Sequence, residues 1–125
     1  MQEIIETSNA PAPIGPYSQG VRANGFIFVS GQIPVQAQTG LVVGGNVAEQ
    51  TRQVMKNITE ILAAAGRGLD SVVKTTVFLA HLEDFPEFNR VYEEYFAEAK
   101  PARATVQVAG LPKKVLVEIE VIATA

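Results

Sequence analysis

Hydrophobic periodicity predicts two amphipathic helices in this chain. After Asn46, apolar residues recur at the three-and-four spacing that places them on one face of a helix. Asn46 is expected to cap this helix, and Gly66 offers the left-handed residue that ends it. A second helix is expected to begin with Asp84 as its N-cap, and it must end before Pro101. The two predicted apolar faces are Val47, Val54, Ile58, Ile61, Leu62 and Ala65, and Phe85, Phe88, Tyr92, Tyr95 and Phe96.

Four segments have the β-branched or alternating pattern of strands. The first is a short apolar run that Gly31 is expected to close. Together with the helices, the order strand, helix, strand, helix, strand, strand is typical of a single-domain α+β fold with both helices packed on one face of a sheet. The simplest local arrangement joins the last two strands as a hairpin through residues 110–114. The predicted strands are residues 26–30, 71–79, 104–109 and 115–123.

Composition narrows the chemistry. The 125 residues, 47% of them hydrophobic, suit one domain spanning residues 1–125. With no cysteine and a single histidine, the chain cannot form disulfides, thiolate nucleophiles or ordinary zinc sites. We interpret that histidine, His81, as a surface or turn residue because it lies between a predicted strand and a predicted helix.

Charge and hydropathy bear on partners and location. The formal net charge is −3 and the basic residues are dispersed, which argues against a nucleic-acid partner. The N-terminal segment lacks the basic region and apolar run of a secretory signal, and no stretch is long and apolar enough to suggest a membrane partner. A soluble, cytoplasmic protein is therefore expected.

The C-terminal strand carries the most informative polar residues. Alternation places Glu118 and Glu120 on one face, about 6–7 Å apart along the strand. Arg103 and Thr105 share a face of the preceding strand if extended backbone reaches back to Arg103. An arginine and a carboxylate on neighbouring strands could bind a small anion and orient a water molecule. The pattern alone favours a plainer interpretation, in which Arg103 forms an ion pair with these glutamates on a solvated or inter-subunit face.

Two other residues are weaker candidates for function. Ser30 precedes Gly31 without the G-x-S-x-G arrangement of a nucleophile, so a turn serine is favoured. Tyr17 follows Pro16 in a constrained loop, where it could form a pocket wall, although a packing role is the default interpretation. The residues alone therefore indicate a small α+β domain with a candidate anion pocket.

Four separated blocks carry a resemblance to a known family: APAPIGPYSQGV at 10–21, VSGQIPV at 29–35, VVKTTVFL at 72–79 and PARATVQVAGLPKKVLVEIEVIA at 101–123. Together they resemble the Rid family, the reactive intermediate deaminases or YjgF-type proteins. The resemblance implies a fold similar to that of the monofunctional bacterial chorismate mutases, with a mixed sheet into which the final strand inserts. That strand then need not pair with the strand before it. It also implies a homotrimer with sites between its subunits.

The resemblance further implies an activity and the residues that perform it. The family hydrolyses 2-imino acids such as 2-iminopropanoate and 2-iminobutanoate, or enamine tautomers such as 2-aminoacrylate, to 2-oxo acids and ammonia without a metal or organic cofactor. Arg103 matches the arginine that binds the substrate carboxylate, and Glu118 matches the acid that orients or activates water. Ser30 and Gly31 match a strand-end element at the pocket.

Other matches are less specific. Tyr17 and Asn89 match further pocket residues, and Thr105 occupies a position where some members have cysteine. Glu120 is interpreted as structural. Two other functions stay open: a non-catalytic module that binds 2-oxo acids or related metabolites, and an endoribonuclease, which the net charge of −3 disfavours.

Overall fold

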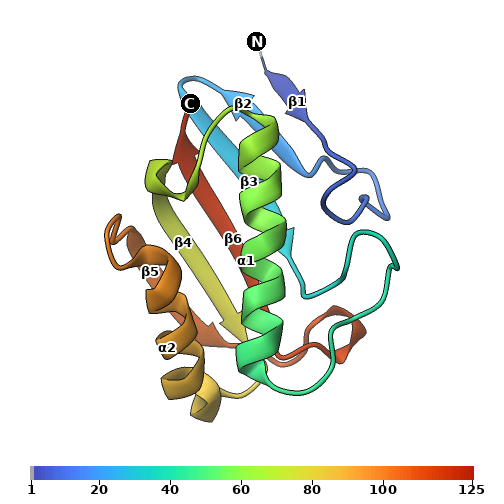
Figure 1. The fold of residues 1–125 in the computed structure, drawn as a ribbon, viewed down its shortest axis with the longest axis vertical. Coiled ribbons are helices and arrows are strands. Elements are labelled where there is room, and N and C mark those ends of the chain that lie inside the picture. The colour runs from blue at the N-terminus through green and yellow to red at the C-terminus, as the bar shows by residue number, and fades with distance from the viewer. Residues whose placement is uncertain (1) are drawn as a thin grey trace.

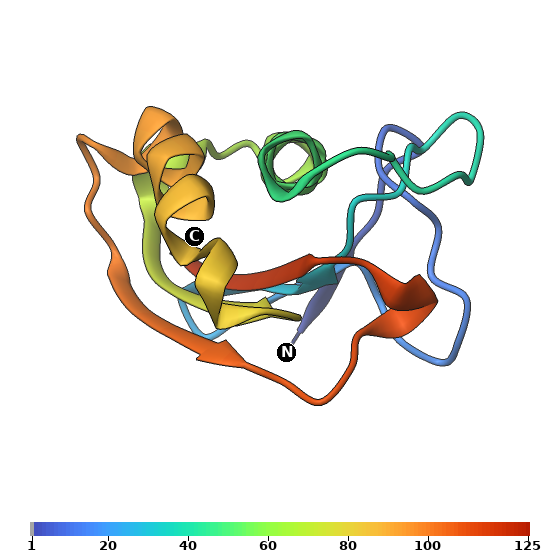
Figure 2. The same ribbon diagram turned by 90° about the horizontal axis from the view of Figure 1, so that it is seen from below.

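The computed structural model describes residues 2–125, which form one mixed sheet and two helices (Figure 1). Figure 2 shows both helices on the same face of the sheet, which confirms the predicted α+β arrangement. Three short 3₁₀ turns complete the regular structure. The strands are β1 (Glu3–Ile5), β2 (Gly20–Ala23), β3 (Phe26–Gln32), β4 (Val72–Leu79), β5 (Ala102–Gln107) and β6 (Val117–Thr124), and the helices are α1 (Val47–Ala64) and α2 (Phe85–Phe96).

The strand order is β1-β2-β3-β6-β4-β5. The predicted hairpin between the last two strands is wrong, because β4 lies between β5 and β6 and pairs with both. β4 and β5 are parallel, which requires a crossover, and α2 supplies it on the face of the sheet. The final strand inserts between β3 and β4 and is antiparallel to each, as the family resemblance implied.

Two strands near the N-terminus were missed from the sequence. β2 and β3 form a hairpin around Asn24 and Gly25, which have φ angles of 56° and 86°. Asn-Gly is the dipeptide that best supports such a turn, because both residues tolerate positive φ. This signal was present in the sequence, whereas the three-residue β1, which pairs with β2, has no pattern long enough to detect.

The predicted N-cap and C-terminal stop of α1 are confirmed, whereas the predicted N-cap of α2 is not. The Asn46 side chain accepts a hydrogen bond from the Glu49 N–H at 2.9 Å, and Gly66, with a φ of 76°, ends α1. Asp84 also precedes its helix, but its side chain makes no capping hydrogen bond, so that prediction is wrong. The reason is that a 3₁₀ turn over Leu82–Asp84 already gives Asp84 helical backbone angles.

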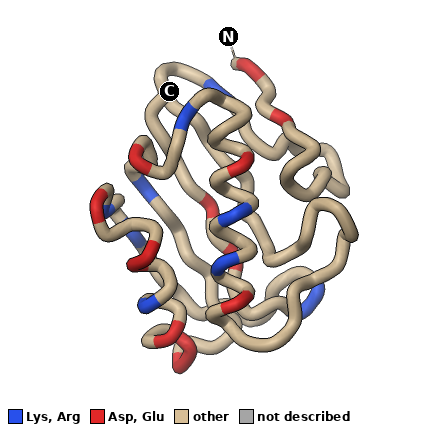
Figure 3. The backbone as a smooth tube through the Cα atoms, in the orientation of Figure 1, with Lys and Arg blue, Asp and Glu red and all other residues tan. Residues whose placement is uncertain are grey.

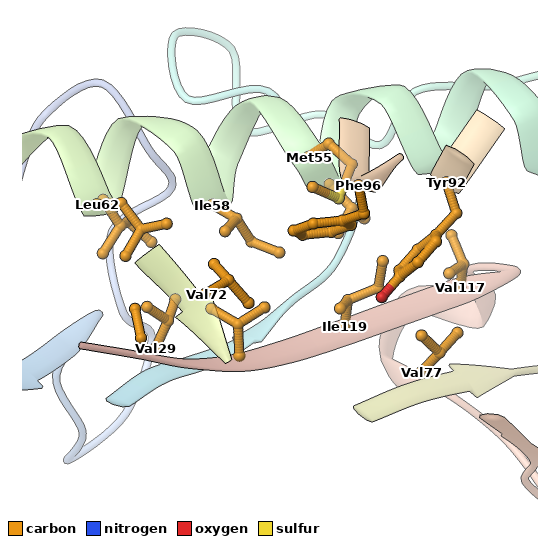
Figure 4. Packing of buried hydrophobic residues seen from close by; sticks show 14 of the residues in the cluster. Val29, Met55, Ile58, Leu62, Val72, Val77, Tyr92, Phe96, Val117 and Ile119 are labelled. Carbon is orange, nitrogen blue, oxygen red and sulfur yellow. The ribbon is translucent and has the colours of Figure 1, made fainter. Parts of the chain in front are cut away.

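The hydrophobic core lies between the helices and the inner face of the sheet (Figure 4). β6 confirms the predicted alternation: Val117, Ile119 and Val121 are buried in this core, whereas Glu118 and Glu120 lie on the outer face. No helix covers that outer face in either view of the ribbon (Figures 1 and 2). Large apolar side chains are exposed on it, including Phe26, Phe28 and Val106.

Candidate functional site

Arg103 lies on the inner face of β5, held against α2. It is in register with Thr75 of β4, whose buried hydroxyl is hydrogen-bonded to the Tyr92 hydroxyl at 2.8 Å. Residues paired across a ladder share a face, so the Arg103 side chain extends toward α2. Its Nη1 donates to the Asn89 Oδ1 at 2.7 Å. Its Cζ lies 4.7 Å from the ring centre of Tyr92 and 5.3 Å from that of Phe85.

This arrangement positions a cation without neutralising it. None of the ion pairs within residues 2–125 includes Arg103, so one copy of the chain does not form within itself the structural pair with Glu118 or Glu120 that the pattern favoured. The aromatic faces and the amide of Asn89 restrict the guanidinium, and its remaining N–H groups stay free for an anion. Burial raises the pKa of the Tyr92 hydroxyl, although its hydrogen bond to Thr75 and the Arg103 charge oppose that shift, so Tyr92 remains a neutral partner.

Thr105 adds an unsatisfied hydroxyl beside the arginine. Its Oγ1 is buried and has no hydrogen-bond partner among residues 2–125. Arg103 and Thr105 line the same open depression of about 670 Å³, together with Leu82, Glu83, Phe85 and Pro86; Glu83 forms no ion pair with Arg103. A buried hydroxyl without a partner costs stability, so it indicates a place where a ligand could complete the hydrogen bond. We call Arg103, Asn89, Thr105, Phe85 and Tyr92 the arginine cluster.

Glu118 lies on the opposite, outer face of the sheet. A β carbon at residue 31 would overlap the Glu118 carboxylate, so Gly31 provides the space that this side chain occupies. Glu118 is half-buried, and this burial, with a smaller contribution from the Glu120 charge, raises its pKa above the ordinary value of a glutamate. A carboxylate with a raised pKa accepts a proton more readily than an ordinary one.

Ser30 and Tyr17 lie near Gly31, the residue that leaves room for the Glu118 carboxylate. The predicted strand end at Ser30 is wrong, because β3 continues to Gln32 with a register shift after Val29. The Ser30 hydroxyl donates to the Ser18 carbonyl, so it holds the preceding loop and is not a free nucleophile. Tyr17, 52% exposed, lines a cavity together with Gly31. We call Glu118, Gly31, Ser30 and Tyr17 the glutamate cluster.

The fold therefore separates the two groups of predicted residues. The prediction that Arg103 and Glu118 lie on neighbouring strands is wrong, because β4 lies between β5 and β6. They also project from opposite faces of the sheet, since Arg103 is in register with buried Thr75 and Glu118 alternates with buried Val117 and Ile119. In one copy of the chain, the arginine cluster and the glutamate cluster therefore face opposite sides of the sheet.

Sequence reasoning missed how α2 supports the arginine. Phe85 and Tyr92 were interpreted only as core residues, yet both rings contact the Arg103 guanidinium. Their spacing was a usable signal: Phe85, Asn89 and Tyr92 are four and three residues apart, which places them on one helical face. His81, in contrast, is exposed, as predicted.

Two features are absent from residues 2–125. This part of the chain contains no group of three or more His, Cys, Asp or Glu side chains arranged to bind a metal ion. Neither helix in it combines the length and apolar character needed to cross a bilayer.

Comparison with known proteins supplies an independent view. Residues 7–125 match the family model described as endoribonuclease L-PSP. The chain is 55% identical to a RutC family protein of Pyrococcus horikoshii, over 98% of each chain. It is 48% identical to the 2-iminobutanoate/2-iminopropanoate deaminase of Mus musculus, over 98% of this chain and 91% of the mouse protein. The crystal structure of a conserved Rid family protein from Yersinia pestis, 48% identical, superimposes with a TM-score of 0.97 over the full length of both chains.

Proposed function

Because the chain belongs to the Rid or YjgF-type family, whose model carries the L-PSP description, we propose that it hydrolyses 2-imino acids and their enamine tautomers to 2-oxo acids and ammonia. The observation that carries this proposal is the arginine cluster: a guanidinium held by Asn89 and two aromatic rings, without a carboxylate partner, beside the unpaired hydroxyl of Thr105. Such a group can bind the carboxylate common to every 2-imino acid. The name of the mouse relative supports the same substrates.

In the proposed mechanism, Arg103 binds the substrate carboxylate and Glu118 transfers protons. The planar guanidinium binds both carboxylate oxygens and so orients the adjacent imine carbon. Glu118 accepts a proton from water as the water oxygen bonds to that carbon. The same carboxyl then returns that proton to the substrate nitrogen. As the carbon–nitrogen bond breaks, the hydroxyl proton of the intermediate passes to the Glu118 carboxylate, the carbonyl of the 2-oxo acid forms, and ammonia leaves; Glu118 then releases this proton to the departing ammonia or to water. A protonated imine is already electrophilic, so the proposed reaction requires neither a metal nor an organic cofactor.

The proposed reaction needs two copies of the chain. The arginine and glutamate clusters face opposite sides of one sheet, so Arg103 of one subunit must meet Glu118 of another. A contact between two different surfaces is heterologous, and repetition of such a contact gives a ring when the rotation between subunits closes. The exposed Phe26 and Phe28 on the outer face give this contact an apolar surface. We therefore propose a homotrimer with three sites between its subunits.

Mixed trimers provide a direct test of these shared sites. Arg103→Ala and Glu118→Gln subunits should each be inactive alone, yet co-expression in equal amounts should restore about a quarter of the wild-type activity per subunit. The reason is that every mixed ring contains one interface with both an intact Arg103 and an intact Glu118. Trimer formation is checked by sedimentation, and activity by imine decay. A monomer in sedimentation, or no recovery in verified mixed trimers, would contradict the shared site.

The activity itself is tested by generating 2-iminopropanoate in solution with an amino-acid oxidase. The imine that escapes hydrolysis is captured by semicarbazide, and the absorbance of the adduct reports how much remains. We expect catalytic amounts of the protein to reduce adduct formation, whereas heat-denatured protein should not. An unchanged adduct yield over a panel of 2-imino acids would reject the deaminase proposal.

A binding-only function would leave a different result. The arginine cluster could hold a 2-oxo acid without catalysis, and calorimetry would then show binding by a protein that never accelerates imine loss. RNA cleavage, the activity in the family model's description, is not favoured. The net charge is −3, and Lys and Arg are interspersed with Asp and Glu over the described part of the chain (Figure 3).

A further inference from the structure

A cavity of about 290 Å³ adjoins the glutamate cluster, and the proposed mechanism does not use it. Tyr17 and Gly31 line it, and Gly31 is also the residue whose missing side chain leaves room for the Glu118 carboxylate. Most of the rest of its lining is apolar; three glutamines, Gln19, Gln32 and Gln36, also line it, and Lys113 is the one charged residue among the described residues that do so. The apolar wall includes Ala12, Ile14, Ile33, Val35 and Ala37.

Buried amides hold two irregular walls of this cavity in place. The Gln19 side chain, 2% exposed, donates to the Pro11 carbonyl at 2.8 Å. On the other wall, the Asn57 side chain, 1% exposed, donates to the carbonyls of Ile33 and Val35 at 3.2 and 3.0 Å. Such hydrogen bonds would be costly to break in the interior, so these loops form a defined pocket before any ligand binds.

We propose that this cavity is the pocket for the substrate's side chain, and that the preferred substrates are 2-imino acids with apolar side chains of about three to five carbons. This inference rests on the proposed deaminase function. An imine carbon placed between Arg103 of one subunit and Glu118 of the next lies beside Gly31, where the cavity opens. Apolar surface in the pocket stabilises an apolar side chain and offers nothing to a short one.

Substrate preference tests the assignment first. The imine derived from leucine should be hydrolysed with a kcat/KM about tenfold or more above that of 2-iminopropanoate, because three more carbons leave water. The imine derived from glutamate serves as the second comparison, since Lys113 could pair with its side-chain carboxylate. Equal values for the leucine and alanine imines, or the highest value for the glutamate imine, would overturn the proposal.

A pocket-filling variant tests the location. Ala37→Phe places a ring in the cavity and should lower kcat/KM for the leucine imine about tenfold, while the value for 2-iminopropanoate changes less than about twofold. Ala63→Phe, on the exposed side of α1, is the matched control and should change neither. Ala12→Phe, on the opposite wall, repeats the test if Ala37→Phe fails to fold. Equal loss on both substrates, or loss on neither, would place the side chain elsewhere.

Product binding separates this inference from the proposed activity. Calorimetry with 4-methyl-2-oxopentanoate and pyruvate needs no turnover, and we expect about tenfold tighter binding of the longer acid to the wild type but not to Ala37→Phe. If the protein binds the longer acid more tightly but does not hydrolyse imines, the deaminase proposal is rejected and the assignment of the pocket is retained. Hydrolysis without any preference for the longer acid would reject the pocket and retain the deaminase.

Discussion

Arg103→Ala should lower kcat/KM for 2-iminopropanoate by about 10²- to 10³-fold, because in the proposed site between two subunits the substrate carboxylate would lose its charged partner. The guanidinium contributes no ion pair to the fold and is exposed in the isolated subunit. The variant should therefore unfold within a few degrees of the wild type and retain its sedimentation behaviour. Imine decay close to the uncatalysed rate, with an unchanged circular dichroism spectrum, is the expected result.

Two control variants show whether the loss of activity in Arg103→Ala comes from the guanidinium of Arg103 itself. Arg103→Lys keeps the charge but not the planar fork that fits a carboxylate and stacks on Phe85 and Tyr92, so we expect an intermediate loss of about 10- to 100-fold. Arg90→Ala removes an exposed arginine from the same helix and should leave the activity unchanged. Full activity in Arg103→Ala would end the assignment of Arg103 as the carboxylate receptor.

Glu118→Gln should lower kcat by about 10²- to 10⁴-fold, because glutamine cannot accept the proton of the attacking water. The wild type should lose activity as pH falls through the pKa of Glu118, which burial and the Glu120 charge raise above that of an ordinary glutamate. The residual activity of Glu118→Gln should lack this acid limb. A rate profile from pH 4 to pH 8 measures both effects.

Stability should respond in the opposite direction. Since the folded protein binds the Glu118 proton more tightly than the unfolded chain does, this group favours folding at low pH. That contribution decreases as pH rises from the ordinary glutamate pKa through the raised one. Glu118→Gln should therefore unfold at a higher temperature than the wild type at pH 7, and the difference should shrink toward pH 4. Lower stability of the variant at pH 7 would contradict this linkage.

Glu120→Gln is the matched control for both measurements. Glu120 is exposed on the same face of β6 and contributes to the raised pKa of Glu118 through its charge. Its replacement should keep the maximal rate and move the acid limb of the rate profile to lower pH. An equal loss of rate in Glu120→Gln would mean that the second carboxylate also takes part in the reaction.

Sequence signals that act within one helical turn predicted the ends of α1 correctly. Asn46 and Gly66 bound α1 as predicted, because a cap and a left-handed stop act within one turn. The strand boundaries shifted by only one or two residues from those predicted. The prediction of a capping hydrogen bond from Asp84 was wrong because residues 82–84 form a 3₁₀ turn, and hydrophobic periodicity does not reveal such a turn.

The candidate site residues lie in an arrangement that the strand pattern did not predict. The sequence indicated Arg103 and Glu118, but it placed them on neighbouring strands, where an ion pair would have been the plainer outcome. The structure puts β4 between their strands and turns the two side chains to opposite faces. The support of Arg103 by Phe85 and Tyr92 also depends on α2 crossing over β4 and β5.

By itself, the sequence determined the helices, most of the strands, the buried face of β6 and the family of the protein. Each of these depends on spacing within a segment or on residues matched one by one. The family resemblance implied that the final strand inserts into the sheet, but only the tertiary structure decided that its neighbours are β3 and β4 and that Arg103 and Glu118 lie on opposite faces. The physical reason is that alternation sets the side of its own strand on which a residue lies, whereas the neighbour of that strand depends on pairing between distant segments.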